Sequence, residues 1–467
     1  MRKGLTALGA ALGGSLLVPG AASAHGLVGR TDLPIPEWLF GWAAAIVLVV
    51  SFVALAVLWP EPKLEGHQGR RLFQIPATIV VDIVCGAVGV ITLGVIVWAG
   101  LEGEPTPSGN FASIFVFVTF WVGLAFVSVL VGDVFTAFNP WRAIGRGVAG
   151  LAKMIRGGDL PAPLPYPERL GRWPAAIGIF CFAFQELAAS DGNLPEHVAI
   201  ATLVYSALTF IAMALYGVDR WIERGEAFSV YFNLFSRISP LERRGDEIWV
   251  RKPLSAITRL EQLPGTVPLL AVMIGSVSFD GAAEGEPWVN IAPDMSTFFQ
   301  DHLSMSPDGA LAVTYTIGLL LCVLIIYGFY MLGIAGARTV GGGFSQGRLA
   351  NGFVHSLVPI AFVYVAAHYF TLLLFEGQRI WPALSDPDGA NFENWGVDYT
   401  LLGANATWYW QVGFVITGHV CALMLAHDRA LVLYRQAKDA VRSQYWMLAI
   451  MVGFTSLALW LLSQANQ

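Results

Sequence analysis

The stretch that decides the fold is GALAVTYTIGLLLCVLIIYGFYMLGIA, residues 309–335, which has no charged side chain over its 27 residues. An α-helix rises about 1.5 Å per residue, so about 20 apolar residues cross a hydrocarbon core of roughly 30 Å. Inside lipid, backbone N–H and C=O groups must pair within their own segment, which favours a helix. This stretch is therefore typical of a membrane-spanning α-helix.

Nine further apolar segments lie on either side of residues 309–335, and most of them are also long enough to span. They occupy residues 36–59, 74–101, 111–137, 173–190, 197–217, 264–283, 349–375, 406–427 and 445–463. Charged residues make up only 13% of the chain and hydrophobic residues 55%, whereas soluble domains carry about 25% charged residues. We expect an all-α, polytopic transmembrane bundle with about ten spanning helices.

The N-terminus has the pattern of a secretory signal peptide. Arg2 and Lys3 precede an apolar stretch rich in small residues, and Ala22-Ser23-Ala24 forms an A-x-A cleavage site. We expect cleavage of residues 1–24, which leaves one integral-membrane domain, 25–467, with His25 at its N-terminus. The alternative is an uncleaved additional helix.

The positive charges indicate which loops face the cytoplasm. With the mature N-terminus outside, the inner loops are 60–73, 138–172, 218–263, 336–348 and 428–444. These loops hold all but four of the 27 Lys and Arg residues, the exceptions being Arg2, Lys3, Arg30 and Arg379. The outer loops carry Asp and Glu instead. The positive-inside rule therefore predicts a bacterial inner-membrane protein with both mature termini on the outer side.

Four of the loops are long enough to have structure of their own. In the inner loops 138–172 and 218–263, the segments 143–156 and 228–244 mix basic and apolar residues, so we expect interfacial helices on the anionic inner leaflet. The outer loops 284–308 and 376–405 are rich in Trp and Phe, and we expect them to cap the outer mouth of the bundle.

Composition excludes several classes of function. The net charge of −6 and the pI of about 5.8 give no reason to expect nucleic-acid binding. The four cysteines lie in apolar runs without a CxxC pair, which indicates neither a disulfide framework nor a zinc knuckle. The glycine run 341–343 lacks the Lys and Ser/Thr spacing of a phosphate-binding loop.

Ionisable side chains within spanning helices are costly in lipid and are candidates for function. Glu186, Asp280 and His368 fall at a similar depth in the outer third of their helices. Carboxylates and imidazoles are ligands of divalent cations, and a bound metal lowers the pKa of its water enough to make a nucleophile. We expect these residues to act as metal ligands or as a catalytic base, with His25 as a further ligand. Alternatively, they hydrogen-bond across helices or line a transport path.

A second, inner polar layer comprises Asp133, His355 and His419, together with Asp82 and His427. His419 and His427 lie two helical turns apart, too far to chelate one ion. A structural role for this layer is expected. Alternatively, if the inner layer is connected to the outer layer, the two together would form a proton or ion relay.

Several strings are shared with one known family: HGLVGR at 25–30, LPIPEWLF at 33–40, NPWR at 139–142, GHV at 418–420 and AHDRAL at 426–431. With them, the sequence resembles, over nearly its whole length, the bacterial multi-spanning membrane proteins described as fenitrothion hydrolases. The resemblance implies hydrolysis of an organophosphorus ester, in a membrane complex with more than one subunit. It carries no catalytic motif that transfers residue by residue.

The leading hypothesis is a membrane-embedded hydrolase of lipophilic phosphotriesters, with a periplasm-facing site and a divalent metal ion as its cofactor. The expected partners are the lipid bilayer and either a second membrane subunit or another copy of this chain. A transporter or channel for an ion, metal or small solute is the alternative, and a non-catalytic subunit of a membrane complex is the third.

Overall fold

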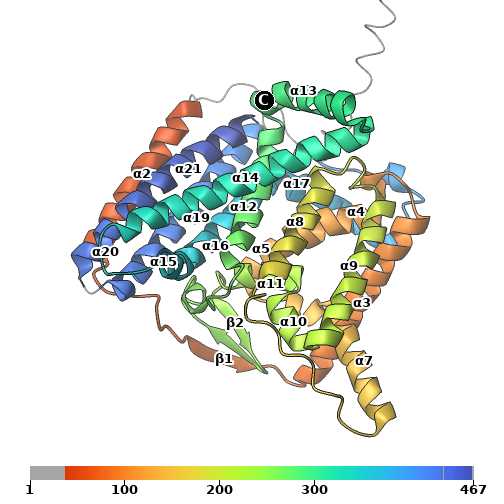
Figure 1. Cartoon of the computed structure of the whole chain (residues 1–467). Coiled ribbons are helices and arrows are strands. Elements are labelled where there is room, and N and C mark those ends of the chain that lie inside the picture. The colour runs from red at the N-terminus through yellow and green to blue at the C-terminus, as the bar shows by residue number, and fades with distance from the viewer. Residues whose placement is uncertain (1–36, 435, 465–467) are drawn as a thin grey trace, which may run out of the picture.

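The ten apolar segments are helical in the computed structural model, which describes residues 37–434 and 436–464 (Figure 1). Within those residues, eight helical segments are long and apolar enough to cross a membrane: α2 (Glu37–Leu58), α3 (Thr78–Glu102), 111–131, α9 (Pro195–Tyr216), α12 (Thr266–Ala283), α14 (Pro307–Arg338), 346–368 and α19 (Ala404–Leu433). Helix α8 (Trp173–Leu187) is apolar but shorter, and α21 (Tyr445–Gln464) is the tenth. The protein is an all-α, multi-pass membrane protein, as predicted. The proposed signal peptide and His25 lie outside the described residues.

Two of the spanning segments are interrupted. Segment 111–131 consists of α4 (Phe111–Ser113), the π-helix η3 (Ile114–Gly123) and α5 (Leu124–Val131). Segment 346–368 consists of α15 (Gln346–Phe353), a short turn of 3₁₀ helix and α16 (Leu357–His368), and α17 (Phe370–Phe375) follows it. Such irregular turns often mark functional positions in helices.

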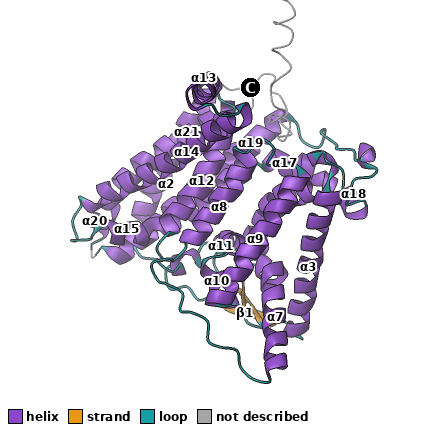
Figure 2. Cartoon of the chain, turned by 45° about the vertical axis from the view of Figure 1, so that its right-hand side comes forward, coloured by secondary structure: helices purple, strands orange, loops and turns teal. Residues whose placement is uncertain are grey.

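Shorter helices connect the spanning segments. They are α6 (Phe135–Phe138), α7 (Pro140–Arg156), α10 (Val218–Arg224), α11 (Ala227–Ser236), α13 (Glu286–Leu303), α18 (Ile380–Ser385) and α20 (Ala437–Ser443). Helix α13 lies across one end of the bundle in both ribbon views (Figures 1 and 2). We call this end the α13 end.

Three short strands form an antiparallel sheet at the opposite end, which we call the sheet end (Figure 2). The strands are β1 (Arg70–Gln74), β2 (Leu241–Arg244) and β3 (Glu247–Val250), in the order β1-β3-β2. β2 and β3 form a hairpin in which Arg244 pairs with Glu247, and Gly245 takes up a positive φ of 62° in the turn. The apolar periodicity of the sequence does not indicate this sheet.

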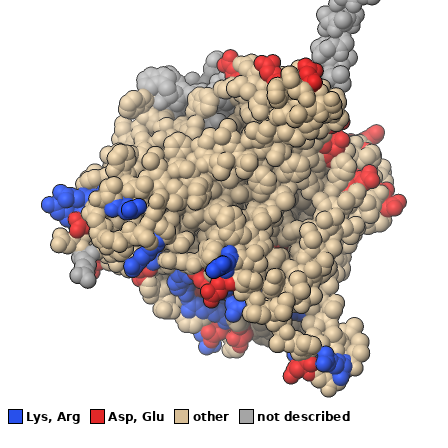
Figure 3. Space-filling model, in the orientation of Figure 1, with Lys and Arg blue, Asp and Glu red and all other residues tan. Residues whose placement is uncertain are grey.

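The two ends differ in charge. Asp and Glu side chains gather at the α13 end and around α18, whereas Lys and Arg gather at the sheet end, accompanied there by some acidic groups (Figure 3). Under the positive-inside rule, this polarity predicts that the sheet end faces the cytoplasm.

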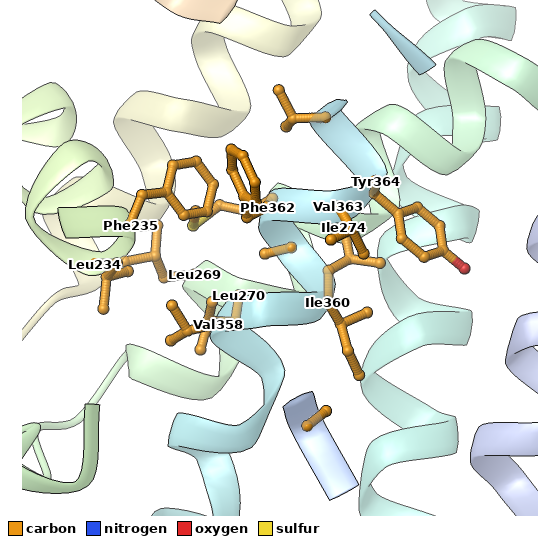
Figure 4. Packing of buried hydrophobic residues seen from close by; sticks show 14 of the residues in the cluster. Leu234, Phe235, Leu269, Leu270, Ile274, Val358, Ile360, Phe362, Val363 and Tyr364 are labelled. Atoms are coloured by element: carbon orange, nitrogen blue, oxygen red, sulfur yellow. The ribbon is translucent and has the colours of Figure 1, made fainter. Parts of the chain in front are cut away.

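Helices α12 and α16 form the centre of the bundle, because most of their residues are buried, whereas α3 exposes most of its surface. On α16, Phe362 packs toward Phe235 of α11, while Ile360 and Tyr364 lie on the other side of the helix (Figure 4). Glycine allows the close approach of α19: a Cβ at Gly418 would lie 2.2 Å from a methyl group of Val363. Small residues at such contacts bring helices together in membranes.

The expectation of an interfacial helix in segment 228–244 is wrong. Residues 227–236 form α11, in which nine of the ten residues are buried, and residues 241–244 form β2. A helix that is buried on nearly all sides packs within the protein and does not lie on the leaflet surface. By contrast, α7 projects at the sheet end with exposed apolar side chains such as Met154 and Ile155, so an interfacial position for it remains a prediction.

Candidate functional site

Asp280 and His368 meet inside the bundle. Asp280 lies near the C-terminal end of α12, and His368 is the last residue of α16. His368 Nε2 lies 2.9 Å from Asp280 Oδ2, and the two side chains are only 10% and 8% exposed. Within an apolar environment, such a pair is held more strongly than in water because the effective dielectric constant is low.

A break in the helix brings a third group to the same carboxylate. Helix α16 ends at His368, and Tyr369 leaves helical geometry with φ −94° and ψ 13° before α17 begins at Phe370. The Tyr369 hydroxyl donates a hydrogen bond of 2.7 Å to Asp280 Oδ2. Consecutive residues of a regular helix point about 100° apart. The break therefore allows both side chains to reach one oxygen atom.

Further polar side chains surround this group. Glu186 of α8 lies near enough to Tyr369, and to Tyr231 of α11, to interact with both electrostatically. The Trp121 ring, carried by the π-helix η3, lies 4.9 Å from the Tyr369 ring between centroids. Helices α8 and α12 pack side by side, which places Glu186 on the neighbour of the helix that carries Asp280.

A small cavity adjoins His368. Its volume is about 20 Å³, and its lining includes His368, Ser278, Tyr364 and Val415. A cavity of at least about 10–15 Å³ holds one water molecule if polar partners are present. The Ser278 hydroxyl donates to the Ile274 carbonyl, and His368 contributes an imidazole to this lining. The His368 imidazole therefore contacts the Asp280 carboxylate and also borders a space for one water molecule.

The predicted metal site has no support in the described part of the chain. There, no group of three or more His, Cys, Asp or Glu side chains is close enough to hold a metal ion. Asp280 and His368 are a carboxylate and an imidazole in contact, and His25 lies outside the described residues.

Two further ionisable residues at the ends of apolar segments, His197 and Glu376, make structural contacts. His197 Nδ1 lies 2.7 Å from the carbonyl oxygen of Asp191, on an exposed turn. Glu376 accepts hydrogen bonds from Arg379 at 2.7 Å and from the Tyr399 hydroxyl at 2.7 Å. None of these contacts involves Asp280 or His368.

Asp82 and Asp133 of the inner layer make structural contacts near the sheet end. Asp82 forms a bidentate pair with Arg243, at 2.6 and 3.0 Å. Asp133 accepts from the Thr136 N–H at 3.2 Å and from the Asn233 amide at 2.8 Å. The Arg142 guanidinium donates to the Thr136 carbonyl.

The histidines of the inner layer are buried and separate from one another. His427 contacts the Trp59 carbonyl through Nε2 and the Gln444 amide through Nδ1. His355 is only 2% exposed. His419 donates from Nδ1 to the Val415 carbonyl of its own helix at 2.7 Å. His419 and His427 have different partners, in keeping with their separation along α19.

Sequence reasoning missed Tyr369, Tyr231 and Trp121. Tyrosine and tryptophan are common in membrane helices, so their presence alone carries no signal. The signal that was available for Tyr369 is its position directly after His368. This position indicates a shared site only when the break in the helix at Tyr369 is known.

No family model, no curated protein and no solved structure matches this chain. The geometry of Asp280, His368, Tyr369 and the adjoining cavity therefore carries the functional argument, and the family resemblance of the sequence strings remains an expectation.

Proposed function

We propose that this protein is a membrane-embedded hydrolase of lipophilic esters, with His368 as general base and Asp280 as the residue that positions it. One observation carries the proposal: the His368 ring contacts the Asp280 carboxylate and also lines a cavity with room for one water molecule. A base held by a second group, next to the site of the nucleophile, is the arrangement that general-base catalysis requires.

The reaction needs only these groups and water. The imidazole accepts a proton from the water molecule while the water oxygen attacks the electrophilic centre of the ester. The bond to the leaving alkoxide or aryloxide breaks, and that group departs with the electron pair. The Asp280 carboxylate stabilises the imidazolium that forms, and the Tyr369 hydroxyl holds the carboxylate in place.

The location of the pair favours an apolar substrate. Asp280 and His368 lie between helices that are long and apolar enough to cross a membrane, and both side chains are almost fully buried. A substrate that partitions into the bilayer reaches such a site between helices. The resemblance to the fenitrothion hydrolases makes organophosphorus triesters the ester class to test first.

The test is hydrolysis of a chromogenic aryl phosphotriester, and of the matching aryl carboxylic ester, by purified protein in lipid nanodiscs. His368→Gln should lower the rate by at least about 10²-fold, because general-base catalysis contributes about 10²–10⁴. His302→Gln is the matched control, because His302 is exposed on α13 and bonds only within its own helix in the described structure. Equal rates for the wild type and His368→Gln would refute the proposal.

Proton- or ion-coupled transport is a second candidate, favoured by one specific observation. Glu186, Asp280 and His368 are ionisable and come from three different apolar helices, an arrangement found in transport paths. If the protein is a transporter, an ion or solute should enter sealed vesicles at a rate that depends on pH. Asp280→Asn should abolish this flux, and the wild type should hydrolyse no ester. Ester hydrolysis by a protein that carries no such flux would support the hydrolase and exclude the transporter.

A further inference from the structure

A second cavity, lined almost entirely by apolar side chains, lies between α12, α14, α16, α19 and α21. Its volume is about 60 Å³. One water molecule needs about 10–15 Å³, so the space takes several waters. A cavity of about 150 Å³ binds benzene, so an aromatic ring enters here only when the lining side chains move apart. Its walls include Phe329 of α14, Phe454 and Met451 of α21, and Ile360 of α16.

His419 supplies the one hydrogen-bonding atom of this lining that is not already used. Its Nδ1 donates to the Val415 carbonyl, and its Nε2 has no hydrogen-bond partner among the described residues. The residue is fully buried, with 0% exposure. The other polar side chains of the lining are engaged: the Tyr330 hydroxyl donates to the Ala350 carbonyl, and the Ser356 hydroxyl to the Phe353 carbonyl.

A neutral imidazole that donates from Nδ1 presents a lone pair at Nε2, so it accepts a hydrogen bond. A buried acceptor without a donor is destabilising, which makes a donor from outside the protein favourable at this point. The lining contributes no carboxylate to neutralise an ammonium group. The chemistry therefore favours an uncharged ligand that is apolar apart from one O–H group.

One wall of the cavity, Phe329, extends to the side of the bundle. Phe329 is 40% exposed on α14, and α14 and α21 pack against each other around the cavity. Both helices have exposed apolar side chains where a bilayer would lie, which favours entry of a ligand from lipid. Aromatic rings and methionine sulfur in the lining interact favourably with an aromatic ring.

We propose that this cavity binds a small, uncharged phenol that enters from the bilayer between α14 and α21 and donates its hydroxyl to His419 Nε2. The proposal does not depend on hydrolysis at His368. The two cavities are nevertheless stacked along the same helices: Val277 and Ile274 of α12 are three residues apart, and Tyr364 and Ile360 of α16 are four apart, with one member of each pair in each lining.

The test uses ¹⁹F NMR titration of nanodisc-embedded protein with 4-fluorophenol and with 4-fluoroanisole, which has the same ring but no O–H group. Empty nanodiscs correct for partition into lipid. The phenol should bind the wild type about tenfold more tightly than the anisole, the factor expected for one buried hydrogen bond. His419→Leu should abolish this preference while leaving anisole binding unchanged.

Gly333 also lines the cavity and provides a matched pair of variants. A Cβ at Gly333 would lie 3.5 Å from Ile450 and 3.6 Å from Met447, which is ordinary contact, so Gly333→Ala should fold and bind both ligands. Gly333→Leu extends into the cavity and should block both. Size-exclusion elution and thermal unfolding confirm that each variant is folded.

Four results would overturn the proposal. The first is equal affinity of the wild type for the phenol and the anisole. The second is a preference for the phenol that survives in folded His419→Leu. The third is unaltered phenol binding in folded Gly333→Leu. The fourth is failure of the wild type to bind the phenol, which would mean that the phenol does not displace a water held on His419 Nε2.

Discussion

His368 and Asp280, 88 residues apart in the sequence, are joined by a 2.9 Å contact between Nε2 and Oδ2 in the interior of the bundle. The contact links α16 to α12, the two helices at the centre of the fold. A pair in such a position has one of two roles. Either it only holds the helices together, or it also serves chemistry at the adjoining cavity, and the two roles predict different effects of substitution.

Tyr369→Phe should lower kcat for ester hydrolysis about tenfold with little change in KM. The variant removes the hydrogen bond of 2.7 Å to Asp280 Oδ2 and so loosens the carboxylate that positions His368. Hydrogen bonds to charged groups contribute about 1.5–3 kcal/mol, and 1.36 kcal/mol corresponds to a factor of ten in rate.

Tyr434→Phe is the control for this prediction. It removes one tyrosine hydrogen bond, to the Ala337 carbonyl, from a helix end away from the site. Equal effects of the two variants on kcat would mean that Tyr369 acts only through stability.

Asp428→Asn should destabilise the protein strongly. In the described structure, Oδ1 accepts from the Trp59 indole at 2.9 Å and the Lys63 N–H at 2.6 Å, and Oδ2 accepts from the N–H groups of Leu64 and Glu65. An amide replaces one acceptor by an NH₂ group that faces donors, and each unsatisfied buried donor costs about 1–3 kcal/mol. Thermal unfolding in nanodiscs measures the effect. Asp159→Asn, at an exposed position, should leave the unfolding midpoint unchanged.

Glu242 should make part of the stability depend on pH. Burial raises the pKa of this carboxyl, but the hydrogen bonds from Arg244 and Arg259 and the charge of Arg251 outweigh burial and lower the pKa to about 2 from its usual 4.5. A lowered folded-state pKa stabilises the fold above the unfolded pKa, and that contribution is lost as the pH falls from about 4.5 toward 2.

The measurement for Glu242 is the midpoint of thermal unfolding of the wild type and of Glu242→Gln between pH 7 and pH 3. The gap between the two proteins should be largest at pH 7 and should narrow below about pH 4.5. A gap that stays constant over this range would show that the arginines contribute nothing through the charge of Glu242.

The charge polarity of the two ends predicts the orientation in the membrane. In a background without the native cysteines, Glu393→Cys in the loop after α18 should react with a membrane-impermeant maleimide on intact spheroplasts. Asp159→Cys, at the sheet end, should react only after permeabilisation. The reverse pattern would invert the topology and place the Asp280–His368 pair nearer the cytoplasm.

The apolar runs predicted the helices well, because the requirement for about 20 apolar residues is a property of each segment alone. The buried position of α11 was not predicted, since Phe228 and its neighbours mix with basic residues further along the chain. The small sheet was also missed. Strands β2 and β3 are four residues each, and β1 pairs with β3 across about 180 residues of sequence, a contact that no local pattern reveals.

The depth of Asp280 and His368 along their helices was available from the sequence, because helix rise converts residue number into distance. Rotation about the helix axis was not available, since apolar side chains surround both residues on all sides. The same limit concealed His419 Nε2, whose cavity depends on side chains from five helices. No proline or glycine next to Tyr369 predicts the break in the helix there.

A double-mutant cycle on ester hydrolysis in nanodiscs tests the central claim most directly. If Asp280 acts through His368, Asp280→Asn and His368→Gln each lower the rate, and the double variant is no slower than His368→Gln alone, because groups that act as a unit are not additive. Rate losses that simply multiply in the double variant, or single variants as fast as the wild type, would contradict the account.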